Sequence, residues 1–113
     1  MIRPDVKTGI PPGTLDMLIL KTLNRLGPIH GYGIAKFIQQ TSDNVLNIEE
    51  GSLYPALQRI LKKGWATAQW VQAGPKRRQR VYQLSPEGRR QLQAEISDYR
   101  RVSLAIGRVI EPA

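Results

Sequence analysis

An apolar repeat near the C-terminus constrains the fold more than any other feature of this sequence. From Pro86 to Ile110, apolar side chains recur at alternating steps of four and three residues: Leu92, Ile96, Tyr99, Ile106 and Ile110, with Ser103 at the intervening step. Such a repeat forms a narrow seam along a helix, as in a coiled coil. About 25 helical residues make a rod of roughly 37 Å, longer than a compact domain of this size needs. The seam therefore predicts a partner helix, most simply from a second copy in a two-fold dimer.

Signals at both ends delimit this C-terminal helix. Ser85 is a capping residue, Pro86 suits the first helical position, and Glu87 places an acid beside the positive end of the helix dipole. Glu111-Pro112 ends the helix. The sequence thus predicts a dimerisation helix over residues 86–110.

Three shorter helices are expected before it. The first follows the capping residue Thr14 and stops at Gly27-Pro28, and the second ends at Ser42-Asp43-Asn44. The third lies within Glu49 to Lys63 and begins a few residues before Pro55, because proline is tolerated only near the first turn. The apolar stripes are Leu15, Leu18, Ile19, Leu23 and Leu26; Ile34, Phe37 and Ile38; and Leu53, Ala56, Leu57, Ile60 and Leu61.

A basic hairpin is predicted between the third and fourth helices. Residues 66–71 and 80–84 have the character of short strands, with Tyr82 and Leu84 pointing inward. Gln72 to Gln79, which contains a Gly-Pro pair and three consecutive cations, is expected as the loop.

The order of these elements predicts a fold class. Three helices, a hairpin and a fourth helix make a mainly α fold with a small β-hairpin, a winged helix-turn-helix whose third helix enters the major groove of DNA. We expect a flexible N-terminal arm over residues 1–13, a winged helix-turn-helix domain over 14–85 and the dimerisation helix over 86–110.

The charge balance favours a polyanionic partner. The 113-residue chain has 17 Lys and Arg against 9 Asp and Glu, a formal net charge of +8. Nucleic acid is the first partner that such a charge favours, and an anionic membrane surface is the second. Because the sequence has neither a bilayer-length apolar run nor a signal peptide, we expect a soluble cytoplasmic protein without a membrane partner.

Residue types for enzyme chemistry are sparse. The chain has no cysteine, which excludes disulfides and thiolate metal sites, and His30 is its sole histidine. It has no phosphate-binding glycine loop, and the adjacent Glu49 and Glu50 would point about 100° apart on a helix. We therefore expect no enzymatic activity, no cofactor and no metal site. His30 is expected to cap a helix or face solvent, and a pH-sensing role is the alternative.

Several short motifs follow one another at natural spacing between about Gly13 and Leu92. They are Gly13-Thr14-Leu15-Asp16 with Leu18-Ile19-Leu20; His30-Gly31-Tyr32-Gly33-Ile34; Glu50-Gly51-Ser52-Leu53-Tyr54-Pro55-Ala56-Leu57 with Arg59; Gly64-Trp65; and Arg77-Arg78 with Tyr82-Gln83-Leu84-Ser85 and Gly88-Arg89. In this order they resemble the PadR family of transcriptional regulators. The resemblance implies a dimeric repressor whose C-terminal helix packs on the other subunit, of the shorter branch with a single long C-terminal helix.

The sequence departs from the family pattern in two places. The hairpin carries Gly74-Pro75-Lys76 beside its paired arginines, which affects the shape of the wing. Tyr99 stands where members of this kind often have tryptophan, so the aromatic character is kept and the side chain is altered.

The third helix and the hairpin hold the candidate residues for binding double-stranded DNA. Polar groups at a helix start suit phosphate and base-edge contacts, and glycine allows close backbone approach. The hairpin cations would follow phosphates or enter the minor groove. The predicted interface is Gly51, Ser52, Leu53, Tyr54, Gln58, Lys76, Arg77, Arg78 and Arg80, with Arg59 further along the helix. The alternatives are that Ser52 only caps, that Tyr54 packs on the hairpin and that the cations form a solvated turn.

The remaining aromatic residues have less specific roles. Tyr99 lies on the seam, where interface packing is the simpler role; the alternative is a small-molecule effector site at the two-fold axis, with Glu95 or Asp98 offering charge to a cationic compound. Trp65 is expected as a wedge between the third helix and the sheet, and Trp70 toward solvent.

Three hypotheses for function follow. The leading one is a sequence-specific repressor that binds a near-palindromic operator as a homodimer and is released by an effector or by a falling protein level. The second is a basic protein that coats nucleic acid without specificity, which would need no dimeric seam. The third is a winged helix that binds a protein, which the cationic hairpin and the net charge of +8 disfavour.

Overall fold

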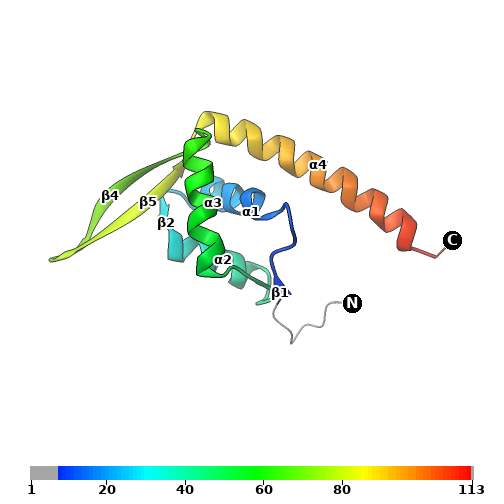
Figure 1. Ribbon diagram of the computed structural model, residues 1–113, viewed down its shortest axis with the longest axis horizontal. Helices are drawn as coiled ribbons and strands as arrows, with labels where there is room; N and C mark the ends of the chain where they lie inside the picture. Colours follow the sequence, from blue (N-terminus) through cyan, green and yellow to red (C-terminus); the bar gives the residue numbers. More distant parts are fainter. Residues whose placement is uncertain (1–7, 113) are drawn as a thin grey trace.

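The computed structural model describes residues 8–112 and confirms the expected order of elements (Figure 1). Along the chain lie β1 (Thr8–Gly9), α1 (Leu15–Leu26), β2 (Ile29–His30), α2 (Gly31–Thr41), β3 (Leu46–Asn47), α3 (Glu50–Lys62), β4 (Ala66–Gly74), β5 (Arg77–Leu84) and α4 (Pro86–Ile110). The first three helices with the β4–β5 hairpin form a winged helix-turn-helix, and α4 extends from it. We call the β4–β5 hairpin the wing.

The first two helices begin in different ways. Thr14 is the N-cap residue of α1, as predicted, but its Oγ1 donates to the carbonyl of Pro11 at 2.8 Å and makes no capping hydrogen bond to the helix. The hydroxyl stabilises the preceding turn instead. His30 caps α2: its Nδ1 accepts a hydrogen bond from the Gly33 N–H at 2.8 Å, as expected for a histidine at a helix entry.

The start of α4 is fastened to the end of α3. The Ser85 hydroxyl accepts from the Gly88 N–H at 3.0 Å and donates to the Gly64 carbonyl at 2.6 Å. The Ser85 N–H donates to the Trp65 carbonyl at 3.0 Å. At Gly88 the two segments come so close that a Cβ would lie 1.9 Å from the Trp65 carbonyl oxygen. These contacts fix the direction in which α4 leaves the domain.

The wing is the longer part of a three-stranded antiparallel sheet in the order β2-β5-β4. Its pairing runs from Ala66↔Leu84 to Gly74↔Arg77, with one irregularity near the tip. Only Pro75 and Lys76 connect the strands, so the expected loop over 72–79 is wrong. Beyond the core both faces of a hairpin meet solvent, and the sequence there shows no apolar alternation that would mark a strand.

The N-terminal segment also pairs with the domain. Thr8 and Gly9 of β1 lie parallel to Leu46 and Asn47 of β3, which immediately precedes α3. The flexible arm predicted over residues 1–13 falls in part on residues 1–7, which lie outside the described part of the chain.

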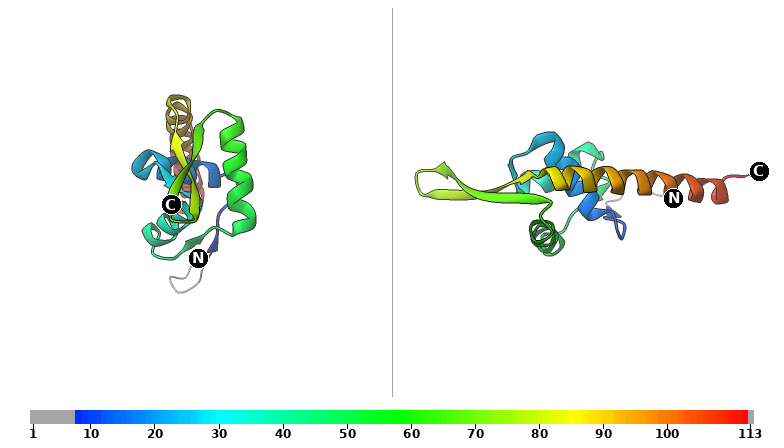
Figure 2. Two further views of the ribbon diagram at one scale, coloured as in Figure 1. Left: turned by 90° about the vertical axis from the view of Figure 1, so that its left-hand side faces the viewer. Right: turned by 90° about the horizontal axis from the view of Figure 1, so that it is seen from above.

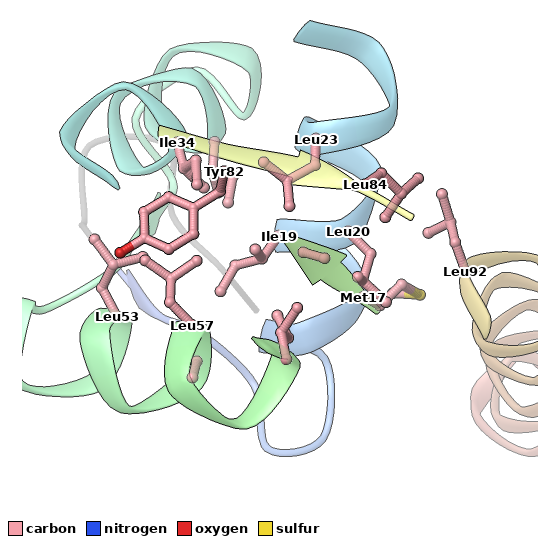
Figure 3. Packing of buried hydrophobic residues seen from close by; sticks show 14 residues of the cluster. Met17, Ile19, Leu20, Leu23, Ile34, Leu53, Leu57, Tyr82, Leu84 and Leu92 are labelled. Atoms are coloured by element: carbon pink, nitrogen blue, oxygen red, sulfur yellow. The ribbon is translucent and has the colours of Figure 1, made fainter. Parts of the chain in front are cut away.

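The core gathers around α1, which contacts α2, α3, α4 and β5. The Tyr82 ring reaches from β5 toward Leu53 of α3, and Leu92 reaches from α4 toward Leu84 (Figure 3). Leu92 is fully buried in this core, so its predicted place in a seam between two copies is wrong. The buried apolar residues are Met17, Ile19, Leu20, Leu23, Ile34, Ile38, Leu53, Ala56, Leu57, Ile60, Ala66, Tyr82, Leu84 and Leu92.

The second half of α4 runs beyond the core. It extends away from the domain at the end opposite the wing, giving an elongated shape of 61 × 33 × 21 Å (Figure 2). Its exposed large apolar residues are Tyr99, Val102, Leu104, Ile106, Val109 and Ile110. Across residues 8–112, no helix combines the length and apolar character that crossing a membrane requires.

The close contact at Gly88 yields a stability prediction. Gly88→Ala should lower the free energy of unfolding by on the order of 2 kcal/mol or more, because the new methyl group collides with the Trp65 backbone. Gly107→Ala in the same helix is the control: its Cβ would meet nothing within 4 Å, so stability should stay equal or rise by up to about 1 kcal/mol. Urea denaturation of both variants measures the difference, and equal midpoints would contradict the role of Gly88.

Candidate nucleic-acid interface

The outer face of α3 carries the polar residues predicted for DNA contact. Gly51, Ser52, Tyr54 and Gln58 are exposed, while the opposite face packs into the core. Leu53 is only 3% exposed, so its side chain belongs to the core and its predicted place in the interface is wrong. The run from Glu50 to Leu57 thus contains both core residues and surface residues, which the helical period places on opposite faces of α3.

The first turn of α3 presents Ser52 at the surface. The N-cap is Glu49, whose carbonyl accepts from the N–H groups of Ser52 and Leu53 at 2.9 and 3.0 Å. Ser52 therefore lies inside the helix, and the alternative in which it caps is wrong. Pro55 also lies inside α3, on its exposed side, and it has no N–H to offer the Gly51 carbonyl one turn earlier.

Tyr54 is half packed and half exposed. Its ring lies along the start of α2, where a Cβ built on Gly31 would be 3.2 to 3.4 Å from the ring and its hydroxyl. The exposed fraction of Tyr54 is 48%. Tyr54 thus rests on α2 rather than only on the wing, and its free side remains on the outer face of α3. Burial raises the pKa of the neighbouring Tyr82, which keeps that phenol neutral.

Arg59 has a different task from the one expected. Its guanidinium forms an ion pair with Asp16 of α1 at 2.9 Å, and the two residues are 43 positions apart in the sequence. The pair is partly exposed, and such pairs contribute at most about 1 kcal/mol to stability. The pair therefore adds a specific contact to the apolar packing of α3 on α1, and it engages the Arg59 guanidinium within the protomer.

The wing carries a cationic surface. Lys76, Arg77 and Arg78 are exposed around the tip, and Arg80 is half-buried nearer the body. The guanidinium of Arg78 lies 5.2 Å from the centre of the Trp70 ring, and that of Arg80 lies 5.9 Å from the Tyr82 ring. Over residues 8–112, no carboxylate lies within ion-pair distance of these four cations. The wing is thus open to an anionic ligand.

Both predicted tryptophan positions are confirmed in outline. Trp65 is half-buried against the core where α3 gives way to β4, and the Lys63 ammonium lies 4.7 Å from its ring centre. Trp70 is 58% exposed on the wing.

The structure brings together three residues predicted for an effector site. Glu95, Asp98 and Tyr99 line a cavity of about 440 Å³ between the start of α1 and α4. Glu95 accepts from the Gln91 amide at 3.0 Å, and Asp98 pairs with Arg101 at 2.7 Å. The cavity opens beside the exposed half of α4. Within residues 8–112, no group of three metal-ligating side chains occurs.

Comparison with known sequences places the chain near a single family. Residues 19–94 match the family described as "Transcriptional regulator PadR-like family". A curated relative, an uncharacterized 37.1 kDa protein in transposon TN4556 of Streptomyces fradiae, is 42% identical over 98 residues. That match covers 86% of this chain, which spans a quarter (25%) of the relative's length.

Solved structures share the fold. A transcriptional regulator from Clostridium thermocellum has a TM-score of 0.81 and 26% identity, with coverage of 88% of this chain and 95% of that one. A PadR family transcription regulator from Clostridium difficile has a TM-score of 0.75 and 25% identity, covering 88% and 100%. Bacillus subtilis PadR, solved in complex with operator DNA, has a TM-score of 0.66 and 24% identity, covering 74% and 47%.

Because Arg59 is paired with Asp16, its loss and the loss of a wing cation should change the salt dependence of DNA affinity by different amounts. Arg77→Ala should flatten the slope of log affinity against log salt by about one per chain, because an exposed arginine that neutralises a phosphate is lost. Arg59→Ala should change the slope much less, since its guanidinium is engaged by Asp16. Fluorescence anisotropy of a labelled duplex at several NaCl concentrations measures both slopes. An equal change in the two variants would refute this division of roles.

Proposed function

The chain belongs to the PadR-like family of transcriptional regulators, and on that premise we propose that it is a cytoplasmic, sequence-specific repressor that binds a near-palindromic operator as a homodimer. The observation that carries the proposal is the outer face of α3, where Ser52, Tyr54 and Gln58 lie exposed. The cationic wing stands beside this face. Bacillus subtilis PadR, which shares this fold, was solved in complex with operator DNA, and this supports operator DNA as the ligand in the proposal.

The two parts of the interface have different roles in the proposal. Residues 14–85 form the DNA-binding domain. Its α3 enters the major groove, where Ser52, Tyr54 and Gln58 meet base edges and Gly51 lets the backbone approach a phosphate. Lys76, Arg77, Arg78 and Arg80 of the wing neutralise phosphates and carry little sequence information.

The exposed half of α4 supports the homodimer. Ile96 packs against the protomer core, and the same stripe continues as Tyr99, Ile106 and Ile110, which are 50%, 54% and 74% exposed. An apolar stripe of this length is covered most simply by its own copy across a two-fold axis. In this proposal the first half of the dimerisation helix, residues 86–110, packs in the protomer core, and its second half packs against the partner.

The cavity beside α4 supports release of the repressor by a small molecule. Tyr99 offers an aromatic face, and Glu95 and Asp98 offer negative charge, which together suit a cationic, partly apolar effector. Because the cavity lies between α1 and the helix that joins two copies, an effector there would act on the relative position of the DNA-binding domains.

The dimer is tested by two substitutions on opposite sides of α4. Ile106→Asp should give a monomer in analytical ultracentrifugation at micromolar concentration, where the parent protein sediments at twice the chain mass, because a buried charge disrupts the apolar contact. Leu104→Asp is the control. Leu104 is 59% exposed, but it lies two positions away and so on the other side of the helix. A monomeric parent protein would contradict the proposal.

Sequence reading is tested by competition between operator and scrambled duplex. Tyr54→Ala should cost operator binding about 1 to 3 kcal/mol per half-site and narrow the gap to scrambled DNA. Arg78→Ala should weaken both duplexes alike. Footprints of the two half-sites should repeat about 34 Å apart, one helical turn of DNA. If Tyr54→Ala weakens both duplexes equally, α3 holds the DNA backbone and the sequence is read elsewhere on the protein.

A further inference from the structure

A groove of about 400 Å³ lies between the start of α2, the outer face of α3 and the wing. Aromatic side chains from four elements line it: Tyr32 of α2, Tyr54 of α3, Trp70 of β4 and Tyr82 of β5. Tyr32 and Trp70 are 69% and 58% exposed, although each could bury a large apolar area. Two exposed aromatic rings on either edge of one groove indicate a ligand that packs between them.

The polar lining of the groove is cationic. Arg77 and Arg80 contribute guanidinium groups, and Gln58 and Gln79 contribute amides. Among the residues that the structure describes, no aspartate or glutamate lines the groove. Aromatic faces combined with guanidinium groups suit a chain that alternates apolar rings with phosphates, as a nucleic-acid strand does.

Each aromatic edge of the groove has a cation next to it. Trp70 lies directly opposite Arg80 in the β4–β5 register, so both side chains lie on the same face of the wing. Arg78 lies 5.2 Å from the centre of the Trp70 ring, and the Lys36 ammonium lies 5.9 Å from the centre of the Tyr32 ring. A phosphate that neighbours either ring would thus meet a positive charge.

The start of α2 forms the floor of the groove. Gly31 is buried beneath Tyr54, and any side chain there would push the Tyr54 ring outward because a Cβ already lies 3.2 Å from its nearest ring atom. Glycine at position 31 therefore lets the Tyr54 ring lie close against the start of α2.

We propose that this groove holds one sugar-phosphate strand of the duplex, with Tyr32 and Trp70 packed on deoxyriboses and Arg77 and Arg80 on phosphates. The proposal rests on the proposed DNA binding. A strand that leaves the base edges beside α3 and passes to the wing has to cross the space between them, and the groove occupies that space. Tyr32 and Trp70 contact DNA without reading its sequence.

The accessibility of Trp70 tests the proposal directly. The chain has two tryptophans, so Trp65→Phe leaves Trp70 as the sole indole reporter. Its quenching by acrylamide should fall several-fold when the protein is saturated with operator, and equally with scrambled duplex, because the contact is to the backbone. An unchanged quenching constant in a complex that anisotropy shows to be saturated would overturn the proposal. If no complex forms at all, the proposed function itself has failed.

Substitutions on the two faces of β4 give a second test. Trp70→Ala should weaken operator and scrambled duplex alike by about three- to tenfold, and Trp70→Phe should retain most of the affinity because it keeps an aromatic face. Val71→Ala is the control, since neighbouring side chains of a strand point to opposite faces. Equal losses for Trp70→Ala and Val71→Ala would show that the wing, and not the groove, had been disturbed.

Discussion

Where the wing ends, the backbone of α4 passes against the backbone of Trp65, in the connection between α3 and β4, and the rest of the architecture depends on this contact. Gly88 admits the Trp65 carbonyl because it has no side chain, and Ser85 donates two hydrogen bonds across the junction, to the carbonyls of Gly64 and Trp65, while its hydroxyl caps α4. The junction orients α4 so that Leu92 enters the core while the second half of the helix projects beyond it. One close approach thus sets the position of the exposed half of α4 relative to α3 and the wing.

Local chemistry made several elements predictable from sequence. The limits of α4 follow from a capping serine, a proline at the first position and a terminal Glu-Pro. The strands of the wing were underestimated because their outer halves have no buried face, so no alternation marks them. The apolar repeat of a helix also does not show which surface the apolar face packs against. Leu92 and Ile106 lie on the same face of α4, but Leu92 packs in the core of its own chain and Ile106 is exposed.

The parts of the candidate site that depend on residue type, such as charge, could be predicted from the sequence. The parts that depend on tertiary contacts could not. The cations of the wing and the polar face of α3 are visible in the sequence because they depend on charge and helical period. The pairing of Arg59 with Asp16 is not, because only the packing of α1 on α3 joins them. The groove between Tyr32 and Trp70 could not be predicted either. Its two aromatic residues lie on α2 and β4, and neither the apolar period nor the composition of the sequence shows that these elements lie side by side.

The length of the protomer has a mechanical consequence. The wing and the free end of α4 lie at opposite ends of a molecule 61 Å long (Figure 2). For a body of this length, rotation by one degree about the far end of α4 displaces the tip of the wing by about 1 Å, which is how small shifts at an interface become large ones elsewhere. In a dimer joined along α4, a small change in the crossing angle of the two helices would change the distance between the two wings. The crossing angle would therefore determine which half-site spacing the dimer can bind.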